Sequence, residues 1–158
     1  MAAPRMPAFD PFDVAESNAS MLPEPFASQA KKRHNRRLGD HVGLTNFGVN
    51  LTRIEPGGLS SQRHSHLKQD EFVWVLEGDV VLVTDAGRQT LEAGSCVGFP
   101  HGTGDAHHFL NEGREDVLLL VVGDRTPDEV ASYPDVDLAG RMDANGRYSF
   151  THKDGSSY

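Results

Sequence analysis

Short apolar runs recur through the middle of the chain, and turn residues separate them. The clearest runs lie at residues 47–51, 72–76, 80–84, 96–99 and 117–122, and glycine-containing turns lie at 77–79, 85–87 and 93–94. Short strands at this spacing are typical of an all-β sandwich or barrel. No helical period of useful length appears before residue 127. We therefore predict an all-β fold.

Length, charge and cysteine content limit the functions that are possible. The 158 residues fit one domain with a substantial core, and the formal net charge of −8 argues against a nucleic-acid-binding surface. No apolar run approaches the roughly 18 residues of a membrane span, and the N-terminus lacks the apolar region of a signal peptide. The single cysteine, Cys96, fits a reducing compartment and a small buried side chain. We expect a cytoplasmic protein with no nucleic-acid or membrane partner.

Composition divides the chain into three segments. Residues 1–40 are proline-rich at first and predict an extended arm. The basic run 31–37 could form an anion or nucleic-acid patch, but in so acidic a chain it is interpreted as a solvated approach to the first strand. Residues 41–125 contain the barrel strands. Residues 126–158 form a polar tail, in which Thr126 and Pro127 predict the start of a short helix and residues 147–152 a possible edge strand.

A pair of histidines marks the candidate site. His64 and His66 project from the same face if the segment is a strand, which suits two ligands of one divalent metal ion. Glu71 has the wrong parity for one unbroken strand, so the chain must turn or bulge before it to supply a third ligand. The following run, 72–76, has the pattern of a strand buried on both faces, so we expect Phe72 and Trp74 in the core.

Two motifs around this pair resemble those of a known family. The first, G-x5-H-x-H-x4-E-x6-G, is matched at every spacing by Gly58, His64, His66, Glu71 and Gly78. The second, G-x5-P-x-G-x2-H-x3-N, is matched by Gly94, Pro100, Gly102, His107 and Asn111, with four residues in place of two before the histidine. Residues 58–111 thus resemble the cupin superfamily. The tail segments 123–127, 133–137 and 152–155 resemble a group of small bacterial cupins that are often named sugar-phosphate isomerases.

The resemblance implies a jelly-roll barrel, commonly dimeric, with a metal bound by three histidines and one glutamate. His107 is the expected fourth ligand because it keeps the spacing to Asn111, with His108 or His101 as alternatives. Many cupins lay an N-terminal arm on the partner of a homodimer. Asp105, in the inserted segment beside the fourth ligand, is the candidate general acid or base.

Nitrogen and oxygen ligands without thiolate suit Fe, Mn, Zn, Ni or Co and do not choose among them. Such a site can polarise a carbonyl, hold an enediolate, acidify water or bind dioxygen. We expect a small, anionic or sugar-like substrate and isomerase or epimerase chemistry. A dioxygenase, a lyase and a non-catalytic ligand-binding or sensor cupin are the alternatives.

Overall fold

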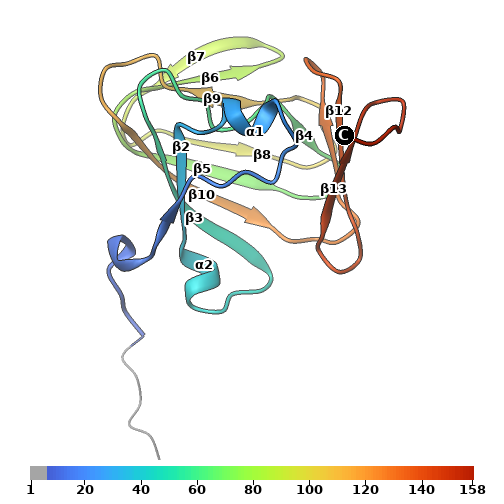
Figure 1. Cartoon of the computed structure of the whole chain (residues 1–158). Coiled ribbons are helices and arrows are strands. Elements are labelled where there is room, and N and C mark those ends of the chain that lie inside the picture. The colour runs from blue at the N-terminus through green and yellow to red at the C-terminus, as the bar shows by residue number, and fades with distance from the viewer. Residues whose placement is uncertain (1–6) are drawn as a thin grey trace, which may run out of the picture.

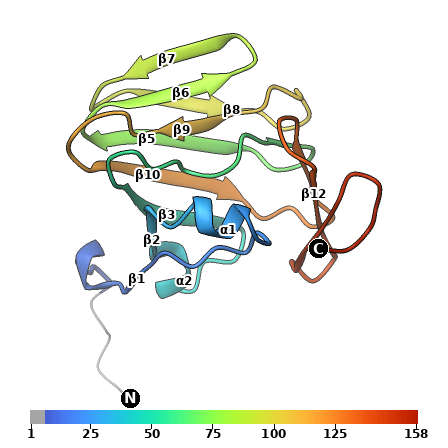
Figure 2. The same ribbon diagram turned by 45° about the horizontal axis from the view of Figure 1, so that its top comes forward.

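The computed structural model describes residues 7–158, and antiparallel strands dominate them. One sheet has the order β1-β2-β3-β10-β5-β8, a second β7-β6-β9 and a third β13-β12-β11-β4 (Figures 1 and 2). The predicted all-β jelly-roll fold is confirmed.

The first sheet comprises β1 (Glu16–Ser17), β2 (Arg33–Arg37), β3 (Phe47–Ile54), β10 (Val117–Asp124), β5 (Glu71–Glu77) and β8 (Cys96–Phe99). The second comprises β6 (Val80–Thr84), β7 (Gly87–Leu91) and β9 (His108–Leu110), and the third β4 (Ser65–His66), β11 (Val130–Tyr133), β12 (Leu138–Met142) and β13 (Tyr148–Thr151).

Alternation along the central strands builds the main core. Val73 and Val75 of β5 are fully buried, and their partners across β10 are Val121 and Leu119. Because paired residues in adjacent strands share a face, these side chains point together into the barrel. The buried cluster is completed by Ile54 and Val117, at the ends of β3 and β10, and from the second sheet by Val80, Leu82, Leu91 and Phe109.

The outer face of the same sheet is apolar and exposed, contrary to the prediction. Phe72 and Trp74 are each 43% exposed, because β5 has only one buried face and they alternate with the buried valines. Cys96 of β8, which is paired with Trp74 of β5, is also exposed rather than buried. A continuous apolar run therefore did not indicate a strand covered on both sides.

Gly78 fixes the tight turn between β5 and β6. Its φ of 75° lies in the left-handed region that favours glycine. A Cβ atom there would also lie 3.0 Å from the carbonyl oxygen of Asp116 and 3.2 Å from a methyl group of Val117. Glycine is also required at position 58, where a Cβ atom would lie 2.9 Å from the carbonyl oxygen of Glu55. The first and last glycines of the first motif are thus held by backbone geometry and close packing.

The N-terminal segment is folded onto the barrel, which corrects the prediction of an extended arm over residues 1–40. From residue 7 it contains η1 (Pro11–Asp13), β1, α1 (Phe26–Gln29), β2 and α2 (Leu38–His41), and β2 pairs with β3 over five residues. Phe26 is buried against Tyr133 and Leu138. Backbone pairing and this buried ring hold the segment on its own barrel, while residues 1–6 of the expected arm lie outside the described residues.

The predicted helix after Thr126 is wrong. Asp128 has a φ of 57°, which a right-handed helix does not accommodate, and residues 130–133 form β11. β11 pairs with β12 on one side and with β4 on the other. β13, at residues 148–151, is the outer strand of this third sheet, which stands at one end of the barrel (Figure 1).

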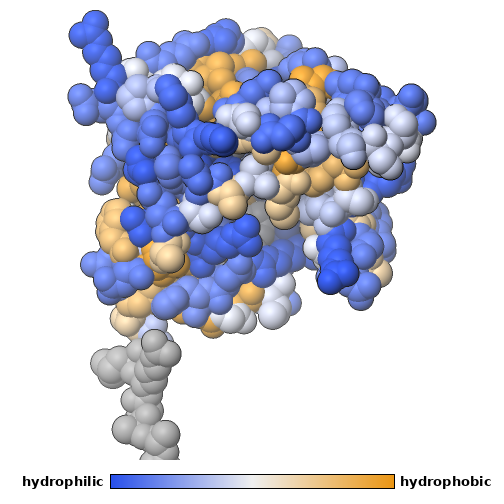
Figure 3. Space-filling model, in the orientation of Figure 1, coloured by the Kyte–Doolittle hydropathy of each residue, from blue (hydrophilic) through white to orange (hydrophobic). Residues whose placement is uncertain are grey.

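Hydrophilic side chains predominate on the face of the molecule in Figure 3, and apolar ones form separate patches. Within residues 7–158, no helix has the length and apolar character needed to cross a membrane.

Candidate metal centre

Two short elements place the histidine pair. His66 belongs to β4, which β11 holds from one side, and the backbone of His64 pairs with that of His107 through two hydrogen bonds of 3.1 and 2.8 Å. The ring centroids of His64 and His66 lie 4.9 Å apart. The loop 67–70 then turns the chain so that Glu71, the first residue of β5, faces them. The sequence predicted such a turn, because Glu71 has the wrong parity to face His66 along one unbroken strand.

His64, His66 and Glu71 each offer one ligand atom, and these three atoms lie within 4.8 Å of one another. Nε2 of His66 lies 3.7 Å from Oε2 of Glu71. Nε2 of His107 lies 3.5 Å from Oε1 of the same carboxylate. The structure thus brings together all four residues that were expected as ligands, with His107 beside the tighter group of three.

His107 is buried deep in the barrel. Its side chain is 2% exposed, and the ring of Phe99 stacks on it with a centroid separation of 3.5 Å. Neither ring nitrogen has a hydrogen-bond partner among the described residues. Buried polar atoms are nearly always paired, so the free Nε2 beside the carboxylate of Glu71 fits the coordination of an ion.

The alternative histidines point elsewhere. Nδ1 of His108 lies 3.1 Å from the carbonyl oxygen of Ser61, and His108 does not line the cavity that opens beside the histidine pair. His101 is exposed, with Nδ1 2.7 Å from Asp70. Asp105 is also exposed and accepts a hydrogen bond from the backbone N–H of Asp85. Asp105 therefore lies outside the site, contrary to the prediction of an acid–base role.

Polar groups flank both rings from behind, with a hydrogen bond at His64 and a longer contact at His66. Nδ1 of His64 lies 2.9 Å from the carbonyl oxygen of Gln62, which leaves Nε2 free to bind an ion when Nδ1 carries the proton. On the far side of His66, Nδ1 lies 3.7 Å from Oε1 of Glu129. Glu129 is fully buried and accepts backbone N–H bonds from Leu67 at 2.6 Å and Lys68 at 2.8 Å. Sequence reasoning missed Glu129 because it assigned this segment to a helix.

The electrostatics suit metal binding. Burial lowers the pKa of His64 to about 4, so its imidazole is neutral at pH 7. For Glu71, burial opposes ionisation, but the contact with His107 and the charges of the histidines leave its pKa below the ordinary value. Neutral imidazoles and an ionised carboxylate are the forms that bind metal ions.

A cavity of about 360 Å³ opens from the cluster, within the range of small-molecule sites. A deeper part of about 180 Å³ reaches His107. The wall of the larger part includes residues 19–22 of the N-terminal segment and Tyr133, Tyr148 and Phe150 of the third sheet. Both terminal segments, which the sequence placed outside the barrel, therefore complete this cavity.

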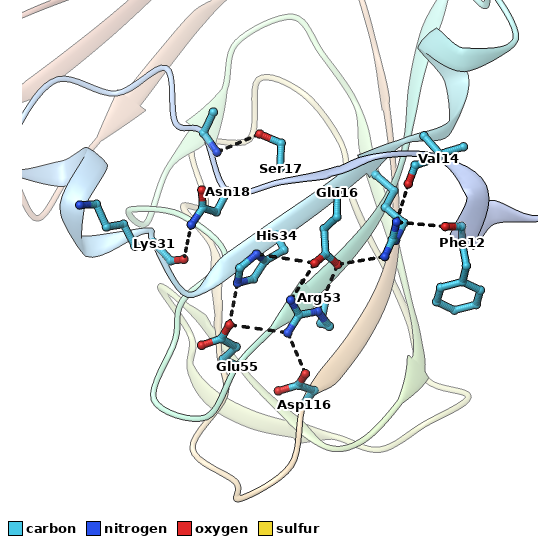
Figure 4. A network of polar contacts seen from close by, with 12 residues as sticks. Phe12, Val14, Glu16, Ser17, Asn18, Lys31, His34, Arg53, Glu55 and Asp116 are labelled. Atoms are coloured by element: carbon cyan, nitrogen blue, oxygen red, sulfur yellow. Dashed lines mark hydrogen bonds and ion pairs between the residues drawn. The ribbon is translucent and has the colours of Figure 1, made fainter.

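The basic run 31–37 also contributes to the wall, which corrects its interpretation as a solvated approach. In β2, Arg33, Asn35 and Arg37 line the cavity. His34 and Arg36 point to the other side, where they meet Glu16 in an ion-pair network (Figure 4). Strand alternation divides one run of charges between two environments.

Comparisons with known proteins identify the family to which this chain belongs. The model of the Cupin domain family matches residues 50–123. A crystal structure from Silicibacter pomeroyi, described as a sugar phosphate isomerase from a cupin superfamily, is 44% identical, covers 96% of each chain and has a TM-score of 0.91. The chain belongs to the cupin superfamily.

Two other solved structures are also similar to this chain. A protein from Acidithiobacillus ferrooxidans that is also named as a sugar phosphate isomerase is 33% identical, covers 80% of each chain and has a TM-score of 0.71. The polyketide cyclase RemF from Streptomyces resistomycificus is 25% identical, covers 76% of this chain and 80% of its own, and has a TM-score of 0.62. A comparison with curated protein sequences gave no match.

Proposed function

We propose that this cupin binds one divalent metal ion through His64, His66, Glu71 and His107. The observation that carries the proposal is the convergence of three ligand atoms within 4.8 Å, beside a buried histidine whose ring nitrogens lack other partners. The donor set of imidazole nitrogens and one carboxylate suits Fe, Mn, Zn, Ni or Co. Four side chains leave positions for a substrate on an ion that prefers six ligands.

The metal centre serves, in our proposal, an isomerase or epimerase reaction on a small oxygenated anion such as a sugar phosphate. The bound ion supplies Lewis-acid polarisation of a carbonyl or hydroxyl oxygen. Two similar structures carry the name sugar phosphate isomerase, and the cavity has the volume of a small-molecule site. The names of these two structures support isomerisation, whereas the cavity volume also suits the dioxygenase, lyase and sensor alternatives.

Two tyrosines contribute to substrate positioning in this proposal. Tyr133 and Tyr148 line the cavity, and the ring of Tyr133 stacks on His64 with a centroid distance of 5.7 Å. Burial raises the pKa of Tyr133 above its ordinary value and that of Tyr148 to about 12. Both phenols therefore stay protonated at neutral pH and can donate a hydrogen bond to a substrate oxygen.

We further propose a homodimer built on the outer face of the six-stranded sheet. Phe72 and Trp74 are exposed there, and Cys96 lies beside Trp74. Large aromatic side chains on one exposed face are enriched at protein interfaces. The free, exposed thiol also supports placing the protein in the reducing cytoplasm, where such a side chain stays reduced.

Turnover by metal-loaded protein tests the enzymatic proposal. Protein purified without an affinity tag or chelator is loaded in turn with Mn, Zn, Ni and Fe and incubated with a panel of aldose and ketose phosphates. We expect interconversion of an aldose and a ketose, or of two epimers, by wild type and none by the His64→Ala/His66→Ala double variant. Oxygen uptake by the Fe-loaded protein with chelating substrates, without isomerisation, would contradict the isomerase proposal in favour of a dioxygenase.

A further inference from the structure

Arg33 directs a positive charge into the metal cavity. It is the first residue of β2, at a register position opposite Ile54 of β3, and it lines both parts of the cavity together with His64 and Glu71. Arg33 and the candidate metal ligands therefore border the same space. This arginine matches no position of the two family motifs, since it precedes the first one by 25 residues.

Arg33 lacks the carboxylate partner that neighbouring arginines have. Its Nη2 donates to the carbonyl oxygen of Ala19 at 3.1 Å, and its Nε is buried with no hydrogen-bond partner among the described residues. Arg37 lies 3.8 Å from Asp40, and Arg125 also pairs with Asp40. Within residues 7–158, Arg33 is thus a partly buried guanidinium without an ion pair.

This arrangement carries an energetic cost that a ligand can offset. Burial and the charge of Arg37 lower the pKa of Arg33 from its ordinary value, but a guanidinium remains protonated in proteins. A buried donor that loses its water without gaining an acceptor destabilises the protein. An oxyanion in the cavity would provide both the acceptor and the counter-charge.

The charge balance favours a multiply charged ligand. A divalent ion with Glu71 and Arg33 leaves about two positive charges facing the cavity, because the carboxylate offsets one of three. Two such charges match a phosphate monoester at neutral pH, and a single carboxylate offsets only one of them. Guanidinium groups bind both anions through paired N–H donors.

We propose that Arg33 is a specificity-determining residue that binds the phosphate or carboxylate group of the substrate while its hydroxyl or carbonyl oxygens face the metal centre. This inference rests on the proposed function and defines its substrate class as small oxygenated oxyanions. It also explains why the N-terminal segment is folded onto the barrel. β2 delivers the anion-binding side chain, and residue 19 accepts one of its hydrogen bonds.

A series of three probes on one carbon frame tests the inference by titration calorimetry. Glycerol 1-phosphate, glycerate and glycerol present a phosphate, a carboxylate and no anion. They are titrated into Zn-treated wild type, Arg33→Gln, Arg33→Lys and Arg37→Gln. The last variant is the matched control, because Arg37 lines the same cavity but is more exposed and has an acidic neighbour.

We expect wild type to bind at least one anionic probe more tightly than glycerol. Arg33→Gln should weaken that binding at least about tenfold, with unchanged Zn content and unchanged glycerol binding. Arg33→Lys should show a smaller loss, because it keeps the charge but not the paired donors. Arg37→Gln should weaken anion binding less than about fivefold. The probe that depends most on Arg33 identifies phosphate or carboxylate as the natural group.

Anion affinity unchanged in Arg33→Gln, or lost equally in Arg37→Gln, would overturn the inference, as would wild type that binds neither anion. Failure of the proposed metal site is distinguishable. If wild type takes up no Zn, the same titrations still compare Arg33→Gln with wild type, and a selective loss of anion binding supports the role of Arg33 alone.

Discussion

The buried carboxylate of Glu129 lies 3.7 Å from Nδ1 of His66, while Nε2 of the same ring lies 3.7 Å from Glu71. One imidazole thus stands between two carboxylates, one in the candidate metal site and one behind it. Glu129 is held in turn by two backbone N–H groups. A carboxylate that hydrogen-bonds the outer nitrogen of a ligating histidine fixes its orientation and its tautomer. Glu129 is the carboxylate beside that nitrogen of His66, which has no hydrogen-bond partner among the described residues.

Glu129→Gln should therefore weaken metal binding about 10- to 100-fold while the barrel stays folded. The measurement is the dissociation constant for Zn by competition with a chromophoric chelator. Glu92→Gln, at an exposed position between β7 and β8, is the control and should leave this constant unchanged. Equal affinities of wild type and Glu129→Gln would show that Glu129 has no positioning role.

Glu16 should contribute a pH-dependent share of stability. The hydrogen bonds from Arg53, at 3.1 and 2.8 Å, lower the pKa of Glu16 below its ordinary value, although partial burial opposes this (Figure 4). A carboxylate whose pKa is lower in the folded state stabilises it above the unfolded pKa of about 4.3 and loses that effect as pH falls through the folded value.

Glu16→Gln should accordingly lower the free energy of unfolding by about 1–2 kcal/mol at pH 7 and by much less at pH 3. Urea unfolding of both proteins at the two pH values measures the difference. A loss of the same size at pH 3 would mean that the ionised form of Glu16 is not the stabilising one.

Phe26 should stabilise the monomer. Its ring is buried against the third sheet, so Phe26→Ala should lower the free energy of unfolding by about 3–5 kcal/mol. Phe12→Ala is the matched control, because that ring is 58% exposed and should cost less than about 1 kcal/mol. The Phe26→Ala loss should not vary with protein concentration. A loss that disappears on dilution would instead place this ring in an interface between copies.

The dimer proposal predicts that a double variant with Trp74→Ser and Phe72→Ser is a monomer, with half the mass of the wild-type dimer in solution. Both side chains are exposed on the outer sheet face and contribute little to the monomer core. Sedimentation equilibrium measures the mass, and Leu67→Ser, at an exposed position outside that sheet, serves as the control. If wild type is a monomer, or if the protein carrying both serine substitutions is still a dimer, this face is not the interface.

Local spacing predicted His64, His66 and Glu71 because these three residues are close in the chain, whereas His107, from a distant segment, was predicted from the second family motif. His64 and His66 are neighbours on one short strand segment, Glu71 follows one loop later, and the spacing to Asn111 selected His107 over His108 as the residue that faces them. Strand alternation and turn glycines likewise predicted the all-β fold.

The remaining parts of the site depend on contacts between distant segments. Glu129 reaches His66 only because β11 pairs with β4, and Arg33 reaches the cavity only because β2 pairs with β3. The helix-start signal at Thr126 and Pro127 concealed a burial pattern of period two at residues 129, 131 and 133, which is the pattern of a strand. The sequence did not reveal this alternation, because the buried residue at position 129 is a glutamate and Val130 lies on the other face.

Metal content by elemental analysis tests the central claim most directly. Protein purified without an affinity tag or chelator is compared with His64→Ala/His66→Ala, His107→Ala and His108→Ala, each checked for a folded barrel by circular dichroism. The account predicts near-stoichiometric Fe, Mn, Zn, Ni or Co in wild type and in His108→Ala, a clear loss in His107→Ala and none bound by the double variant. Full metal occupancy in the double variant, or a wild type that neither contains nor takes up metal, would contradict it.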